Sequence, residues 1–169
     1  MWIKCYYEGN LNQDISKNIK IEIQFLMRCK SIPHIVQLLD YGIFNNDQGL
    51  IEVFDYYNCT NIYILNFQRT EKKYSPIFQK EEIKIVAKCL LEFLDCLHSK
   101  NYLHRAINHR HILAMLNEGT GLIKDVVVCG FGKSKSSIFV EEASIYYSEI
   151  DEDYLYIDID IIDRNYYTT

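Results

Sequence analysis

The stretch of sequence that decides the fold is LHSKNYLHRAINHRHIL, residues 97–113. Apolar residues recur at helical spacing through the preceding segment, which predicts an amphipathic helix over about residues 75–98 with Pro76 near its start. A polar break at Lys100-Asn101 ends that pattern, and a β-rich run begins at Ile112. The stretch therefore predicts a long helix, a polar loop and a strand, in that order.

Further elements are predicted on both sides of this stretch. The apolar spacing of residues 14–28 predicts a second amphipathic helix. Short β-rich runs predict five strands. The first is at residues 2–7. The other four form two pairs around polar turns, 34–39 with 50–57 and 112–116 with 122–129. A mixture of helices and antiparallel strands of this kind is typical of an α+β fold.

The composition excludes several classes of protein. The chain has 169 residues, of which 49% are hydrophobic and 24% charged, enough apolar material for a buried core. A formal net charge of −5 gives no basic footprint for nucleic acid. No apolar run has the length of a membrane span, and the first residues lack the pattern of a secretory signal. We therefore expect no nucleic-acid partner, no membrane partner and an intracellular location, cytoplasmic or nuclear.

The six cysteines are expected to be reduced. They are scattered along the chain, form no CxxC pair, and mostly lie in apolar segments where cysteine acts as a small buried residue. The run His109-Arg110-His111 has two potential metal ligands but no third ligand at a fitting spacing. A polar loop is the favoured interpretation of that run.

Several motifs in a fixed order resemble those of the protein kinase superfamily. Residues 97–113 are similar to the end of the long helix and the catalytic loop H-R-D-L-x-x-x-N, and residues 126–132, VVVCGFG, are similar to the strand that carries D-F-G. The other matches are Ile3-Lys4 to V-A-I-K, Glu22 to its acidic partner, residues 32–42 to the passage that usually contains H-P-N-I-V, and Leu50–Tyr57 to the strand before the nucleotide hinge.

The resemblance implies a two-lobe α+β fold that is incomplete at both ends. It places a partial small lobe, from the family's third strand onward, in residues 1–57. It places a partial large lobe, up to about its central helix, in residues 58–169, including an acidic tail rich in Ile and Tyr. Kinase domains are longer than this chain, so we expect the domain to be truncated.

The residues at the catalytic positions of the resemblance are not those that phosphoryl transfer needs. The loop is represented by His104, Arg105, Ala106, Asn108 and His111, with Ala106 at the position of the catalytic aspartate and Asn108 at that of a lysine. The two positions that supply Mg²⁺ ligands hold His111 and Gly130. Glycine offers no ligand, and imidazole suits Mg²⁺ poorly. We therefore expect no functional catalytic residue and no metal at this site.

The nucleotide-binding positions are expected to be vestigial. The resemblance assigns them to Lys4, Glu22, the gatekeeper Phe54, and the hinge residues Asp55 and Tyr56. The family's glycine-rich loop precedes V-A-I-K, whereas this chain begins three residues before Lys4. We expect no cofactor at these positions.

The resemblance also implies that a column of packed side chains is kept. The family aligns four side chains through both lobes, and the corresponding residues are Leu26, Leu38, His104 and Phe131. All four are of suitable types, so His104 is expected to be structural rather than catalytic. Packing kept while charged chemistry is lost is typical of a pseudokinase.

Two interpretations of the last part of the chain remain open. Residues 147–149 and 158–163 resemble the end of the activation segment and the start of the next helix, with Asp160 at the buried aspartate of that helix. Alternatively, the nine acidic residues of segment 141–163, which has no Lys or Arg, form a solvated end. Residues 133–137 fall at the activation segment and are expected to be a polar loop.

Three functions are compatible with the sequence. The first is a catalytically inactive kinase-like domain that binds or scaffolds another protein. The second is a divergent active kinase that transfers phosphate from ATP to Ser or Thr, with Mg²⁺ held by other ligands such as Glu118 or Asp125. The third is a non-functional gene fragment.

Overall fold

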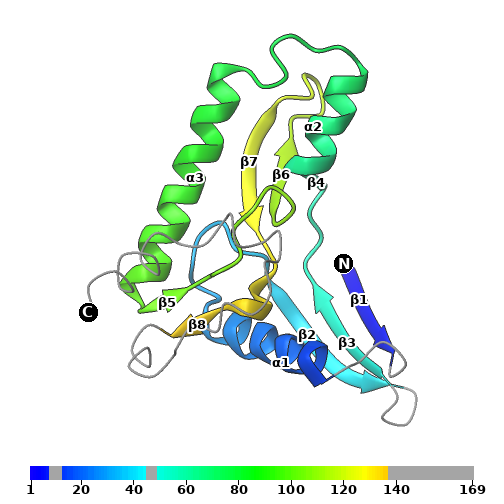
Figure 1. The fold of residues 1–169 in the computed structure, drawn as a ribbon, viewed down its shortest axis with the longest axis vertical. Helices are drawn as coiled ribbons and strands as arrows, with labels where there is room; N and C mark the ends of the chain where they lie inside the picture. The colour runs from blue at the N-terminus through cyan, green and yellow to red at the C-terminus, as the bar shows by residue number, and fades with distance from the viewer. Residues whose placement is uncertain (8–12, 45–48, 137–169) are drawn as a thin grey trace, which may run out of the picture.

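An antiparallel sheet with one helix makes up the first half of the structure, a computed structural model that describes residues 1–7, 13–44 and 49–136. Strand β3 (Gly49–Phe54) lies between β1 (Trp2–Tyr7) and β2 (Leu38–Phe44). Helix α1 (Gln13–Arg28) lies beside this sheet and contacts β2 (Figure 1). The alternatives for segment 141–163, with Asp160, lie outside the described residues.

Helix α1 forms because its apolar residues make one continuous face. Ile19, Ile23 and Leu26 are buried at spacings of four and three residues, whereas Lys20 and Gln24 are exposed. The predicted helix at residues 14–28 is confirmed.

Strand β2 does not lie where the sequence predicted it. The prediction placed a strand over residues 34–39, but β2 runs from Leu38 to Phe44 and the residues before it form a loop. His34 has a φ of 57°, in the left-handed region that an extended strand cannot contain. The backbone of this loop instead bonds to the second half of the chain, where Val128 N–H donates to His34 O at 2.7 Å.

The second half contains two helices and a second sheet. Strand β4 (Cys59–Asn61) leads into α2 (Ile62–Glu71), and α3 (Lys80–Ser99) follows. The sheet has the order β4-β6-β7, with β6 (Ile112–Leu116) and β7 (Ile123–Val128) antiparallel. The short strands β5 (Tyr102–Leu103) and β8 (Lys135–Ser136) pair with each other. The chain between them contains the loop 104–111, β6, β7 and the turn η2 (Phe131–Lys133). The α+β fold class is confirmed, and the expected boundary at residues 57 and 58 falls between β3 and β4.

Helix α3 begins later than the sequence predicted. The prediction started it at about residue 75, but its first residue is Lys80, so Pro76 lies outside the helix. The Gln79 N–H donates to Glu82 Oε2 at 2.9 Å, which satisfies a backbone donor at the helix start. The spacing of Gln79 and Glu82 was the sequence signal for this start.

Helix α2 was missed because its first residues, IYILNF, have the composition of a strand. Asn61 caps it by accepting the Ile64 N–H at 2.8 Å. Arg69, buried near its end, forms a two-pronged pair with Glu82 of α3 at 2.8 and 2.9 Å. Burial raises the pKa of Glu82, but Arg69 and two backbone N–H groups outweigh that effect and hold the pKa below its ordinary value. This pair fixes α2 against α3.

The two halves share one apolar core. Its buried residues come from α1, the loop before β2, the ends of β2 and β3, the last part of α3, β6, β7 and η2. A second cluster lies between α2, α3 and the second sheet. Among the described residues, no helix combines the length and apolarity needed to cross a membrane.

Candidate functional site

The loop at residues 104–111 connects β5 to β6 and is anchored by a buried histidine. The His104 ring donates from Nε2 to Cys129 O at 3.1 Å, while its Nδ1 accepts the Ala106 N–H at 3.2 Å. Burial lowers the pKa of His104 to about 3, although the bond to the Cys129 carbonyl opposes this effect. The ring is therefore neutral at physiological pH. Its contacts are those of a packing residue that holds the loop against the end of β7.

The four residues expected to form a packing column are all buried. Leu26, Leu38, His104 and Phe131 have side chains that are at most 4% exposed. The ring centroids of His104 and Phe131 are 4.5 Å apart, and Phe131 also stacks on Phe25 at 4.9 Å. Phe131 therefore connects α1, through Phe25, to His104 of the loop 104–111.

The two positions that the resemblance assigns to Mg²⁺ ligands lie against each other. Gly130 has a φ of 82°, and a Cβ atom added to it would lie 2.7–2.8 Å from three atoms of the His111 ring. Real Cβ atoms do not approach so closely, so the imidazole occupies the space that a larger residue 130 would need. His111 Nδ1 lies 2.6 Å from Ala106 O and donates to it. The ring therefore bridges the loop to the end of β7.

The residues at the positions of the catalytic aspartate and lysine, Ala106 and Asn108, carry no group that could accept a proton from a substrate hydroxyl. Ala106 is buried and apolar, and Arg105 is exposed with a φ of 66°. Asn108 is buried, and its Oδ1 accepts the Arg110 N–H at 2.8 Å. Asn108 therefore shapes the turn of the loop.

Lys4 contacts two carboxylates. Its Nζ lies 3.0 Å from Glu22 Oε1 on α1 and 3.8 Å from Glu52 Oε2 on β3, and it also lies over the Phe54 ring at 4.7 Å. Burial alone lowers the pKa of Lys4, but the charges of Glu22 and Glu52 outweigh it and raise that pKa. The structure thus brings together the predicted Lys4, Glu22 and Phe54.

The predicted hinge residues lie apart from this group. Asp55 is exposed and accepts the Tyr56 N–H at 2.8 Å, and its own N–H donates to Gln37 O at 3.0 Å. The Tyr56 ring is exposed and meets Trp2 edge-on at 6.4 Å. Neither side chain contacts Lys4 through a described interaction.

Glu52 is a site residue that the sequence prediction missed. Its side chain is fully buried, Oε2 accepts the Tyr6 hydroxyl at 2.8 Å, and Oε1 has no hydrogen-bond partner within the described part of the chain. Burial, followed by the charge of Glu22, raises the pKa of Glu52 despite Lys4 and Tyr6. The available signal was a single acidic residue within the apolar strand GLIEVF.

The alternative Mg²⁺ ligands lie elsewhere. Glu118 is exposed in the turn that joins β6 to β7, whereas His111 and Gly130 flank the other end of this strand pair. Five residues of strand separate the two ends by about 16 Å. Asp125 contacts His34 and Cys89. The structure does not bring Glu118 to the loop 104–111.

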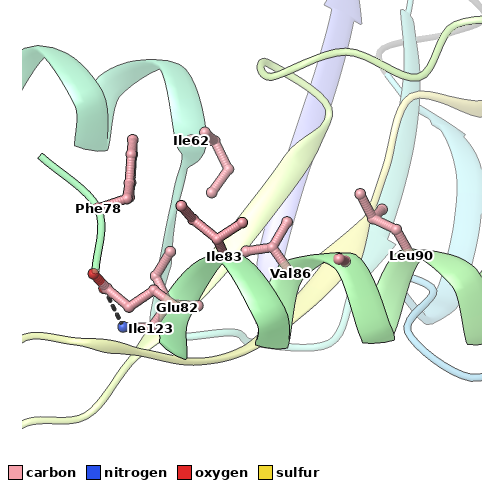
Figure 2. A pocket seen from close by; sticks show the side chains of 8 residues that line it. Ile62, Phe78, Glu82, Ile83, Val86, Leu90 and Ile123 are labelled. Carbon is pink, nitrogen blue, oxygen red and sulfur yellow. Dashed lines mark hydrogen bonds between the residues drawn. The ribbon is translucent and has the colours of Figure 1, made fainter. Parts of the chain in front are cut away.

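An apolar hollow lies outside this site, along the first part of α3. It has a volume of about 300 Å³ and is open to solvent (Figure 2). The apolar side chains around it are Ile62, Phe78, Ile83, Val86, Ala87, Leu90 and Ile123. Glu82 borders it with its oxygen turned away to the Ile123 N–H at 2.8 Å. The hollow therefore offers almost only apolar contact.

Comparison with known proteins agrees with the order of the motifs. Residues 1–169 match the family described as the protein kinase domain. The chain belongs to the protein kinase family. It is also similar to a probable cyclin-dependent serine/threonine-protein kinase of Dictyostelium discoideum, with 29% identity over 100 residues. That similarity covers 59% of this chain and 7% of the relative, so the chain corresponds to a small part of that protein.

The contact between Gly130 and His111 predicts an energetic coupling between these residues. A Gly130→Ala substitution should lower the free energy of unfolding by about 3 kcal/mol, combining left-handed backbone strain with overpacking. In a His111→Ala background the same substitution should cost only about 1–2 kcal/mol, because the ring is gone. Urea unfolding of the four proteins measures the coupling.

Gly121→Ala is the matched control for this cycle. Gly121 has a φ of 67° and no atom near its added Cβ, so its substitution isolates the backbone strain. An equal loss for Gly130→Ala in both backgrounds would contradict the contact.

The buried Glu52 predicts a pH-dependent gain from Glu52→Gln. Because its pKa is raised on folding, the folded chain binds more protons than the unfolded chain above pH 4.5, and charged Glu52 lowers stability there. At pH 7 Glu52→Gln should raise the free energy of unfolding, because a neutral amide of the same shape replaces a buried charged carboxylate. This gain should shrink as the pH falls toward 4.5.

Urea unfolding at a series of pH values between 4.5 and 7 measures the effect. Glu118→Gln, at an exposed position, should show no such trend. A gain from Glu52→Gln that does not depend on pH would show that the carboxylate charge is not its cause.

Proposed function

We propose that this kinase-family domain transfers no phosphate and acts by binding another protein. The observation that carries the first part is the contact between His111 and Gly130. Phosphoryl transfer depends on Mg²⁺ to neutralise developing charge, and Mg²⁺ requires oxygen ligands in a nearly octahedral arrangement. At these two positions the chain has an imidazole packed on a glycine, which leaves neither an oxygen ligand nor room for an aspartate side chain.

The surroundings of Lys4 support the same proposal. Its ammonium group is already compensated by Glu22 at 3.0 Å and approached by Glu52 at 3.8 Å. Active kinases also keep the contact with the first carboxylate, so the difference lies in Glu52, a buried carboxylate that a nucleotide phosphate at Lys4 would approach. Like charges at such distances repel, so this group favours an internal network over a phosphate contact.

The apolar surface of α3 supports the second part of the proposal. Ile83 and Leu91 are 59% and 67% exposed, and Ile83 borders the hollow shown in Figure 2. Large apolar side chains that are exposed beside a hollow with apolar walls are characteristic of an interaction site. A polypeptide that presents apolar side chains at helical spacing has the matching chemistry.

The proposal predicts that the chain has no phosphotransferase activity. With labelled ATP, either Mg²⁺ or Mn²⁺, and a general protein substrate, transfer should equal that of a protein-free control. Lys4→Ala should give the same result. Measurable transfer that disappears in Lys4→Ala would contradict the proposal.

A divergent kinase remains the second candidate, because Lys4 and Glu22 keep the contact that the family uses. A thermal-shift titration separates the two candidates. A nucleotide at 100 times its Kd would stabilise the chain by about 2.7 kcal/mol, which corresponds to about 5–10 °C. We expect a shift below about 1 °C, whereas a metal-dependent rise of several degrees would favour the kinase.

The binding surface can be tested without knowing the natural partner. Peptides selected on the full chain from a displayed random library should carry apolar residues at helical spacing. Their affinity should fall about tenfold or more for Ile83→Asp or Leu91→Asp, because a buried apolar anchor contributes 1–2 kcal/mol. Lys84→Asp, an exposed polar position on the same helix, is the control. Selected peptides that bind both apolar variants as well as the parent would contradict this surface.

A further inference from the structure

Three side chains that commonly ligate transition metals meet at the middle of β7, between α3 and the loop before β2. They are His34 in the connection between α1 and β2, Cys89 in α3, and Asp125 in β7, and their ligand atoms all lie within 4.8 Å of one another. His34 Nδ1 lies 3.1 Å from Asp125 Oδ1, and Cys89 Sγ lies 3.3 Å from the same oxygen. In a tetrahedral zinc site, metal–ligand bonds of about 2.0–2.3 Å place ligand atoms about 3.2–3.8 Å apart. Small shifts of these side chains therefore create a site of the right size.

A fourth residue holds the histidine as a metal ligand requires. Glu92 Oε2 lies 3.1 Å from His34 Nε2, on the side of the ring opposite Asp125. Histidines that bind metals usually donate their second ring N–H to a carboxylate, which leaves the other nitrogen free for the metal. Glu92 is in turn 3.8 Å from Lys88 one helical turn earlier. With Nε2 held by Glu92, Nδ1 of His34 is the ligand atom. Nδ1 also lies 3.2 Å from the Val126 carbonyl oxygen, so a bound metal would replace that hydrogen bond.

Backbone hydrogen bonds also hold Asp125 and the loop that carries His34. The Val126 N–H donates to Asp125 Oδ1 at 2.8 Å, which orients the carboxylate toward His34 and Cys89. The His34 carbonyl is held by the Val128 N–H at 2.7 Å, so the loop that carries the imidazole is tied to β7. The three ligands therefore come from separate elements that are already fixed to one another.

The chemistry of the ligands selects the metal. Thiolate, imidazole and carboxylate together suit Zn²⁺, whereas Mg²⁺ prefers oxygen ligands alone. Cys89 is buried, but Asp125 is only partly covered, so solvent reaches the open side of the cluster. Three protein ligands leave one position of a tetrahedral zinc ion for water.

We propose that His34, Cys89 and Asp125 bind one Zn²⁺ ion, with Glu92 positioning His34 and water as the fourth ligand. Binding forms Zn–N, Zn–S and Zn–O bonds and releases the thiol proton to solvent. The ion links the α1–β2 connection to α3 and β7, so it raises the stability of the joint between the two halves. This proposal does not rest on the proposed function, because the cluster is separate from the loop 104–111.

The test uses the full chain, freed of metal with a chelator under reducing conditions. Titration with Zn²⁺ against a chromogenic zinc chelator should give one ion per chain, and Mg²⁺ should not compete. Substitution with Co²⁺ should give the thiolate charge-transfer absorption and the visible bands of a tetrahedral ion. Zn²⁺ should also raise the melting temperature, because it binds only the folded arrangement.

Variants identify the site. Cys89→Ser and Asp125→Asn, which preserve side-chain shape, should each weaken Zn²⁺ binding about 100-fold or more, and Glu92→Gln about tenfold. Cys96→Ser, at a partly buried position on the same helix, should leave affinity and the Co²⁺ spectrum unchanged. The melting temperature of each metal-free variant checks its folding, and Asp125→Asn provides the test if Cys89→Ser does not fold.

Other results would overturn the proposal. No uptake of Zn²⁺ would show that the cluster is only a hydrogen-bonded network in which the thiol and imidazole donate to Asp125. Zn²⁺ binding that is unchanged in both Cys89→Ser and Asp125→Asn would place the ion elsewhere. So would a loss of affinity in Cys96→Ser as large as the loss in Cys89→Ser.

Discussion

The ring of Phe131 is the point at which the two halves of this chain are held together. It is fully buried, stacks on Phe25 of α1 at 4.9 Å, and meets Phe93 of α3 and His104 edge-on at 6.2 and 4.5 Å. Aromatic rings bury large apolar areas and prefer these offset and edge-on geometries. Since α1 belongs to the first half and α3 to the second, the position of one ring determines how the two halves pack.

This packing also determines what happens at the residue before the ring. With Phe131 directed into the core, Gly130 adopts a φ of 82°, and the His111 ring fills the space beside it. His111 is anchored by the Ala106 carbonyl, and His104 is anchored by the Cys129 carbonyl. The loop 104–111 is therefore held by hydrogen bonds between imidazoles and backbone carbonyls, where phosphoryl transfer would require carboxylates and a metal ion.

The sequence predicted the parts of the structure that depend on local patterns. Helix α1 and strands β1 and β6 lie where apolar spacing and β-rich composition placed them, and the buried state of Leu26 and Phe131 agrees with their expected packing role. Helix α2 was missed because Asn61 and the buried Arg69 stabilise a segment with strand-like composition. The start of β2 was misplaced because His34 takes a left-handed conformation that depends on its bond to β7.

The site was predicted less completely, because its important contacts join distant parts of the chain. Lys4 and Glu22 were paired through the family resemblance, but the contact of Lys4 with Glu52 depends on the register of β1 against β3, which places the two residues opposite each other. Likewise, His111 meets Gly130 because β6 and β7 pair Ile112 with Val128. A register error of one residue would move each side chain to the other face of its sheet. Motif spacing identified which residues replace the catalytic groups, but only the pairing of strands shows that they fill the site.

Packing and phosphoryl transfer place different physical demands on the side chains of a kinase-family domain. Burial of Leu26, Leu38 and Phe131 depends on apolar area and volume, and many combinations of side chains meet that requirement. A magnesium site depends on particular oxygen atoms at fixed positions, so replacement of one ligand removes it. Strand β7 carries both kinds of residue. Its buried valines contribute to the core, Asp125 within the strand contacts His34 and Cys89, and Gly130 follows its last residue, Val128, after Cys129. A core that depends on buried apolar area therefore tolerates substitution of polar side chains more readily than a magnesium site does.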